Sequence, residues 1–170
     1  MGRFPDERLD PQSYPPPGLD LPVLYNDIDP NGHLNNVAYG RFFEHVRVLR
    51  HDRMNLHRLF ELPDPYVLLV AQITIDYLAE SGIGEPIHLR CRTAHVGTSS
   101  LVEEAAAWQF GSCIALATTT VVLRRGDVAA PWPPEVVTVL DTFREGGVPA
   151  DLDSLPHYRG PGARRNDRSP

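Results

Sequence analysis

The sequence predicts an α+β domain in which one curved antiparallel sheet wraps around one long central helix. Residues 37–54 are the only long segment whose apolar residues recur at three- and four-residue steps, which is typical of a helix. Four long segments rich in β-branched residues then follow one another across short turns, as in an antiparallel sheet. Because a single helix must bury its apolar face, we expect the sheet to cover it.

The first elements are a short strand over residues 21–25, a polar loop, and the helix over residues 37–54. Asn35 or Asn36 suits the helix N-cap, and Pro63 lies beyond its C-terminal end. The predicted buried face is rich in aromatic residues and consists of Tyr39, Phe42, Phe43, Val46 and Leu49.

The rest of the chain is dominated by strands. They are predicted over residues 66–78, 85–97, 99–110 and 112–125. The last of these is apolar on both faces, as expected of a strand inside the sheet. Residues 133–143 begin with proline and predict a short closing helix.

Composition divides the chain into three parts. We expect a flexible, proline-rich arm over residues 1–20, a folded domain over residues 21–145, and a disordered polar tail over residues 146–170. The predicted sheet has open edges, and pairing between copies would cover one of them. The sequence therefore predicts a homodimer or a homotetramer.

Charge and composition limit the function. The net charge of -6 argues against a nucleic-acid partner, and all 16 cationic residues are arginine, which excludes Schiff-base lysine chemistry. We see no apolar run of the roughly 18 residues that a membrane helix needs, and no signal segment at the start. Cys91 and Cys113 are not in a C-x-x-C pattern. These features indicate a cytoplasmic protein without disulfides, zinc or a membrane partner.

The loop ahead of the helix, DIDPNGHLNN at residues 27–36, begins like a calcium-binding loop. Asp27, Asp29, Asn31 and Gly32 match the first ligand positions and the glycine of an EF-hand. The twelfth position requires a bidentate glutamate, but it is Ala38. The sequence therefore predicts no metal site. Its residues alone leave two alternatives open, a turn with a helix cap or a catalytic loop.

A wider stretch of sequence carries a family resemblance. YNDIDPNGHLNNVAYGRFFEHVR, residues 25–47, resembles the signature of hotdog-fold thioesterases of the 4-hydroxybenzoyl-CoA thioesterase type. The similarity extends over about residues 20–143 and includes the G-T-S-S turn at residues 97–100. It implies a hotdog fold and an acyl-CoA thioesterase that hydrolyses a thioester to a free acid and CoA with no cofactor or metal.

The same resemblance implies roles for the loop residues. Asp29 would be the catalytic carboxylate, acting as general base on water or as nucleophile on the thioester carbonyl. The backbone N–H of Asn36, alone or together with that of Val37, would stabilise the oxyanion at the helix N-terminus. Gly32 would let the loop approach the substrate closely.

A second resemblance concerns two further loop residues, Asn31 and His33. The loop is also similar to that of plant acyl-acyl-carrier-protein thioesterases, in which the positions of Asn31 and His33 are implicated in catalysis. In that case His33 would polarise water or orient Asp29, and otherwise it would hold the loop. Glu44 lies near the carboxylate position of another hotdog branch, or else faces solvent or a second subunit.

Coenzyme A phosphates lead us to expect arginine and hydroxyl groups at the pocket mouth. The candidates are Arg90, Arg92, Ser99 and Ser100, and Tyr39 would border the acyl pocket. Two alternatives remain beside the acyl-CoA thioesterase. One is a thioesterase for acyl groups on a carrier protein, and the other is a hotdog domain that binds acyl-CoA without hydrolysing it.

Overall fold

The computed structural model describes residues 6–62 and 64–146. Its sheet runs antiparallel in the order β1-β3-β4-β5-β2, and β6 pairs with β5. The strands are β1 (Leu19–Leu21), β2 (Tyr66–Tyr77), β3 (Ile87–Val96), β4 (Ser100–Gln109), β5 (Ser112–Arg125) and β6 (Val128–Ala129). The helices are α1 (Asp6–Leu9), α2 (Asn36–Arg53) and α3 (Pro134–Arg144), with 3-10 turns at Pro11–Ser13, Tyr25–Asp27 and Leu56–Phe60.

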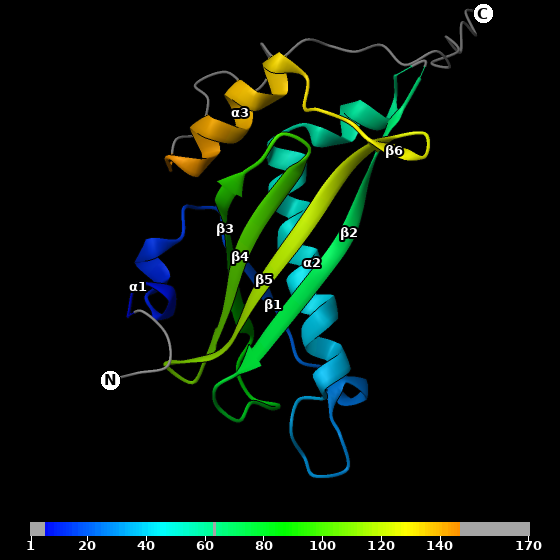
Figure 1. Ribbon diagram of the computed structural model, residues 1–170. Coiled ribbons are helices and arrows are strands. Elements are labelled where there is room, and N and C mark those ends of the chain that lie inside the picture. The colour runs from blue at the N-terminus through cyan, green and yellow to red at the C-terminus, as the bar shows by residue number, and fades with distance from the viewer. Residues whose placement is uncertain (1–5, 63, 147–170) are drawn as a thin grey trace, which may run out of the picture.

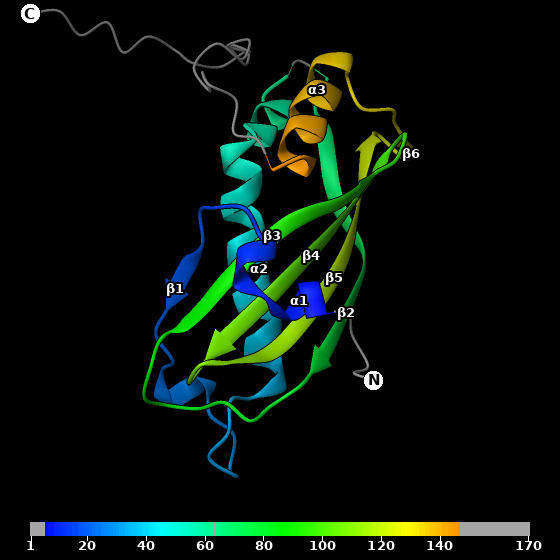
Figure 2. The same ribbon diagram turned by 90° about the vertical axis from the view of Figure 1, so that its left-hand side faces the viewer.

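The long helix α2 lies against one face of the curled sheet, as Figures 1 and 2 show from two directions. The predicted arrangement of one curved antiparallel sheet around one helix is confirmed. The predicted helix at 37–54 is α2, and the four long strands and the closing helix agree with the prediction to within two residues at each end.

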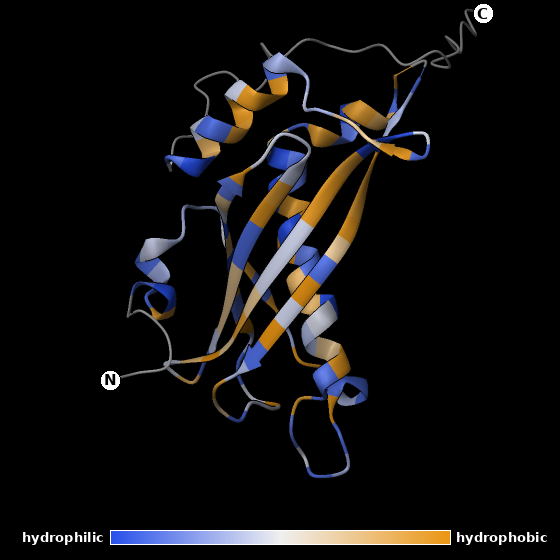
Figure 3. Cartoon of the chain, in the orientation of Figure 1, coloured by the Kyte–Doolittle hydropathy of each residue, from blue (hydrophilic) through white to orange (hydrophobic). Residues whose placement is uncertain are grey.

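The main core lies between α2 and the sheet. Phe42, Phe43 and Val46 of α2 are almost fully buried. They pack against small residues of the central strands, including Ala105, Ala107, Ala115 and Ala117, which leave room for the aromatic rings. Figure 3 shows apolar and polar residues alternating in bands along the strands, while the loop ahead of α2 is mostly hydrophilic.

The first predicted strand was misplaced. The sequence predicted a strand over residues 21–25, but β1 ends at Leu21. Proline has no N–H to donate, so Pro22 cannot continue the ladder that β1 forms with β3. The chain instead turns through the 3-10 helix Tyr25–Asp27 into the loop that precedes α2.

The N-terminal segment also differs from the prediction of a flexible arm over residues 1–20. Residues 8–14 pack on the outer face of the sheet, where Tyr14 is only 1% exposed and meets Trp108 edge to face at 5.5 Å, and residues 19 and 20 belong to β1. The Trp108 indole N–H donates to the Leu9 carbonyl at 2.9 Å. These aromatic and backbone contacts fix the segment. Residues 1–5 and the tail from residue 147 lie outside the described residues.

A buried polar cluster lies between α2 and the sheet. The carboxylate of Glu103, 1% exposed, lies 2.8 Å from the Nε2 atom of His51. Two arginines of α2, Arg47 and Arg50, are also buried. Arg50 donates to the Thr93 hydroxyl at 3.2 Å and to the Phe143 carbonyl at 3.0 Å. Glu103 therefore supplies negative charge in a region that buries two cations.

We expect Glu103→Gln to lower the free energy of unfolding by about 3–5 kcal/mol, because it removes the buried carboxylate that contacts His51 and offsets the charge of buried Arg50. Urea denaturation at neutral pH would measure this loss. The matched control is Glu44→Gln, which removes an exposed carboxylate that pairs with Arg47 at 3.5 Å. The control should cost no more than about 1 kcal/mol. Equal losses in the two variants would contradict this assignment.

Candidate active site

Residues 27–35 form a small hairpin directly ahead of α2, which we call the Asp29 hairpin. At its base the Asn35 N–H donates to the Asp27 carbonyl at 2.7 Å, and Ile28 bridges to Leu34. Nearer the tip the Asp29 N–H donates to the His33 carbonyl at 2.8 Å. Gly32 has a φ of 83°, in the left-handed region that favours glycine, so the turn itself requires this residue.

The Asp29 carboxylate is held by its own hairpin. Its Oδ1 atom accepts the N–H groups of Asn31 and His33 at 2.8 and 3.1 Å, and the Asn31 side-chain amide donates to Oδ2 at 3.3 Å. The His33 N–H, followed by the Asn31 groups, holds the pKa of Asp29 below its ordinary value. Asp29 is therefore ionised at neutral pH, and Asn31 is its direct partner.

The start of α2 lies beside this carboxylate. Asn35 is the N-cap, and its side chain accepts the Val37 N–H at 2.9 Å. This contradicts the expectation that the Val37 N–H is free to bind substrate, because the cap already uses it. Among the described residues the N–H of Asn36 has no acceptor. Asn36 thus offers a free donor at the positive end of the helix dipole.

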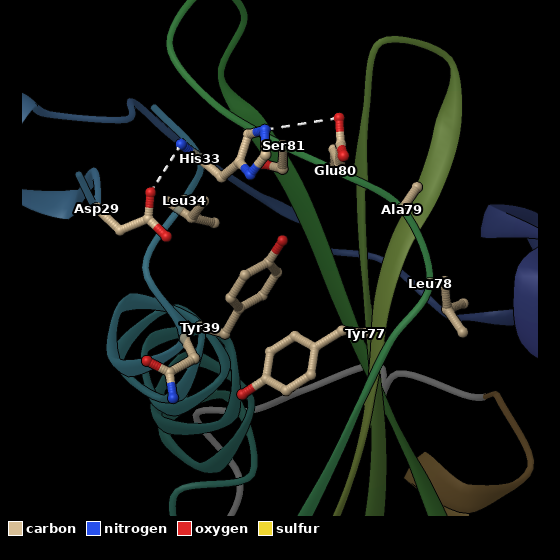
Figure 4. Close-up of a pocket in the computed structure, with 10 residues that line it drawn as sticks. Asp29, His33, Leu34, Tyr39, Tyr77, Leu78, Ala79, Glu80 and Ser81 are labelled. Atoms are coloured by element: carbon tan, nitrogen blue, oxygen red, sulfur yellow. Dashed lines mark hydrogen bonds and ion pairs between the residues drawn. The ribbon is translucent and has the colours of Figure 1, made fainter. Parts of the chain in front are cut away.

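The hairpin and the helix start line one wall of a pocket of about 480 Å³. The other wall comes from the end of β2 and the loop after it (Figure 4). The lining residues are Asp29, His33, Leu34, Asn36, Tyr39, Tyr77, Leu78, Ala79, Glu80 and Ser81. Tyr39 and Tyr77 meet edge to face at 5.1 Å and form an aromatic side of the pocket.

His33 contributes to both walls. Its backbone N–H donates to Asp29, whereas its ring turns toward the opposite wall, where Nε2 lies 3.6 Å from a Glu80 carboxylate oxygen (Figure 4). The Leu34 N–H also donates to the Ser81 carbonyl at 2.7 Å. The His33 ring and the Leu34 N–H therefore both connect the hairpin to the loop after β2. Sequence reasoning missed Glu80 and Ser81, because they follow β2 without any recognisable pattern.

Four of the predicted substrate-binding residues lie elsewhere. Arg92 donates to the Ser13 carbonyl at 3.3 Å and Arg90 to the Tyr14 carbonyl at 3.1 Å, so both hold the N-terminal segment on the outer face of the sheet. Ser99 and Ser100 lie at the β3–β4 turn, where the Trp132 indole donates to the Ser100 carbonyl. Among the described residues, none of these four lines the pocket of Asp29.

The described residues contain no group of three or more His, Cys, Asp or Glu side chains placed to hold a metal ion. Within the same residues, every helix is too short or too polar to cross a membrane.

A helix held in a curled antiparallel sheet is the arrangement of the hotdog fold. The sequence matches the model of the thioesterase-like superfamily over residues 23–140, and the chain belongs to this superfamily. None of the curated proteins compared with the chain matches it.

Solved structures agree on the fold. The chain is similar to a thioesterase from Thermus thermophilus complexed with coenzyme A and zinc, with 24% identity, a TM-score of 0.67, and coverage of 75% of this chain and 94% of that one. A thioesterase superfamily protein from Jannaschia sp. is 29% identical, with a TM-score of 0.65 and coverage of 77% and 84%. A 1,4-dihydroxy-2-naphthoyl-CoA thioesterase from Synechocystis is 15% identical, with a TM-score of 0.65 and coverage of 73% and 94%.

If Asp29 is the catalytic carboxylate, the hydrogen bonds to it predict the pH dependence of activity. Because they lower its pKa, the carboxylate loses its charge only below the ordinary aspartate value of about 3.9. We expect kcat/KM to stay level from neutral pH down to about pH 5 and to fall below that ordinary value. Asn31→Ala removes one of these hydrogen bonds and should move the acid limb upward. Circular dichroism at each pH should confirm that the protein stays folded. A fall of kcat/KM that begins well above pH 5 in the folded protein would contradict this assignment.

Proposed function

We propose that the protein is an acyl-CoA thioesterase that hydrolyses its substrate to a free acid and CoA. Superfamily membership supports thioester hydrolysis in general. The single observation that carries the finer proposal is that the ionised Asp29 carboxylate shares one pocket with Asn36, whose N–H has no acceptor among the described residues.

The reaction requires an attacking group and a donor for the developing charge. Asp29 either takes a proton from the attacking water or attacks the thioester carbonyl itself. In the second route its carboxylate forms a mixed anhydride, the C–S bond breaks with release of the CoA thiolate, and water then hydrolyses the anhydride. In both routes the carbonyl oxygen gains negative charge, which the Asn36 N–H and the helix dipole stabilise.

Single-turnover hydrolysis in ¹⁸O-labelled water separates the two routes. Direct attack by water places the label in the acid formed in the first turnover. The anhydride route leaves the label on Asp29 when water attacks the aspartyl carbonyl, and in the acid when it attacks the acyl carbonyl. Label on Asp29 after one turnover therefore establishes the nucleophilic role.

Coenzyme A is the favoured carrier because the similar Thermus thermophilus thioesterase is complexed with it and the similar Synechocystis enzyme acts on a CoA thioester. A thiol-release assay should use a panel of alkyl- and aryl-CoA thioesters and the same acyl groups on an acyl carrier protein. We expect turnover of at least one CoA thioester. Faster turnover of the carrier-protein substrates would instead indicate a thioesterase for acyl groups on a carrier protein. Tight acyl-CoA binding without turnover would indicate a hotdog domain that binds acyl-CoA without hydrolysing it.

We further propose that the protein is a homodimer joined through β2. This strand lies at one end of the sheet order and carries a row of exposed apolar side chains: Val67, Leu69, Val70, Ile73 and Tyr77. Such an edge invites pairing with a second copy. Light scattering should give a dimer mass for wild type and a monomer mass for Val70→Arg, whereas Val128→Arg on the β6 hairpin should stay dimeric. A wild-type monomer would contradict this. We also propose that the protein is located in the cytoplasm.

A further inference from the structure

The first aspartate of the D-x-D pair, Asp27, has no role in the chemistry proposed above, yet it and Glu103 are the two buried carboxylates of the described residues. It is 3% exposed, whereas Asp29 lies two residues further toward the tip of the Asp29 hairpin and is partly exposed. Burying an aspartate costs free energy unless its charge is paired and its oxygens accept hydrogen bonds. Asp27 meets both conditions.

Asp27 ties together three parts of the chain. Its Oδ2 atom accepts the Leu24 N–H at 2.9 Å, at the start of the 3-10 turn. Its backbone carbonyl accepts the N–H of Asn35, the N-cap of α2. Its Oδ1 atom forms an ion pair with the guanidinium of Arg41, which lies in the second turn of α2. The base of the Asp29 hairpin is therefore fastened both to the helix cap and to the helix itself.

The hydrogen bonds at the tip of the hairpin do not have this effect. Among the described residues, the Asp29 carboxylate accepts hydrogen bonds from residues 31 and 33 alone, and these bonds shape the turn without fixing its position relative to α2. Movement of the hairpin about its base would carry Asp29 away from the Asn36 N–H while leaving the turn intact. A displacement of about 1 Å at a reacting group can cost about 100-fold in rate.

We propose that Asp27 and Arg41 are a positioning pair for the reaction at Asp29. The pair sets the distance between the Asp29 carboxylate and the N-terminus of α2, and neither residue touches the substrate. This inference rests on the proposed thioesterase function.

The test is a double-mutant cycle of wild type, Asp27→Asn, Arg41→Gln and the double variant, assayed on the best acyl-CoA of the panel. We expect each single variant to lose about 10- to 100-fold in kcat with KM within about twofold, because positioning acts on the chemical step. The double variant should be no slower than the slower single variant. Arg41→Lys keeps the charge and should recover part of the rate.

The matched control is Arg144→Gln. Arg144 is 42% exposed in its side chain and pairs with Asp141 at 3.2 Å on α3, whereas the Arg41 side chain is 44% exposed. Hydrogen exchange gives a readout that does not depend on turnover. The Asp29 and Asn35 amide protons should exchange faster in Arg41→Gln than in wild type, and at the wild-type rate in Arg144→Gln.

Arg41→Gln with wild-type kcat and wild-type exchange at both amides would overturn the proposal, as would additive losses in the double variant. If Asp27→Asn does not fold, the exposed Arg41 variants alone decide the matter. Asp29→Asn is assayed in parallel. An inactive Asp29→Asn beside a fully active Arg41→Gln refutes only the positioning pair, whereas a fully active Asp29→Asn refutes the proposed mechanism.

Discussion

Replacing Asp29 by asparagine is expected to lower kcat for acyl-CoA hydrolysis by about 10²- to 10⁴-fold. The amide keeps the size of the side chain and one acceptor oxygen for the N–H groups of Asn31 and His33. It cannot take a proton from water, and it is a poor nucleophile toward a thioester. The loss should therefore fall on the chemical step and leave substrate binding little changed.

The control for this variant is Asp64→Asn. Asp64 is an exposed carboxylate that pairs with Arg125 at 2.6 Å, and both residues lie outside the pocket of Asp29. Its kcat should match that of wild type. Thiol release at neutral pH and thermal unfolding of both variants complete the comparison. An Asp29→Asn enzyme with wild-type kcat and normal folding would rule out the carboxylate as the reacting group.

Much of the fold could be predicted because its signals are local. The three- and four-residue spacing of the aromatic residues along α2 can be seen within one segment of sequence. The same holds for the β-branched composition of each strand. The candidate loop could be located for the same reason, since Asp29, Asn31, His33 and Asn36 all belong to one hairpin and helix start. A short stretch of chain thus contains most of the proposed chemistry.

The predictions that failed depend on contacts between distant segments. Arg90 and Arg92 alternate along β3 as predicted, but the strand pattern could not show that residues 11–14 cover that face of the sheet. The second wall of the pocket comes from residues 77–81, which reach Asp29 only through the curl of the sheet.

The core of α2 shows the same limit. Arg47 and Arg50 are buried there, because Glu103 on β4 supplies negative charge and Thr93 on β3 accepts from Arg50. Hydrophobic periodicity assigns apolar residues to the buried face of a helix, so it cannot predict that an arginine is buried there.

The second large effect concerns the backbone of Asn36. This residue is the first of α2, and helices accept proline at that position because its N–H has no partner within the helix. The residue before a proline must be extended, and Asn35 already is, with φ −63° and ψ 138°. Asn36→Pro therefore removes the proposed oxyanion donor while leaving the helix start in place. Asn36→Ala removes the same side chain but keeps the N–H.

The kcat of Asn36→Pro relative to Asn36→Ala, measured on the best acyl-CoA, tests most directly whether the helix N-terminus and Asp29 act on one thioester carbonyl. Loss of one oxyanion donor should make the proline variant about 10²- to 10³-fold slower than the alanine variant, at equal unfolding free energy and similar KM. Equal kcat values in two folded variants would contradict the proposed role of the Asn36 N–H.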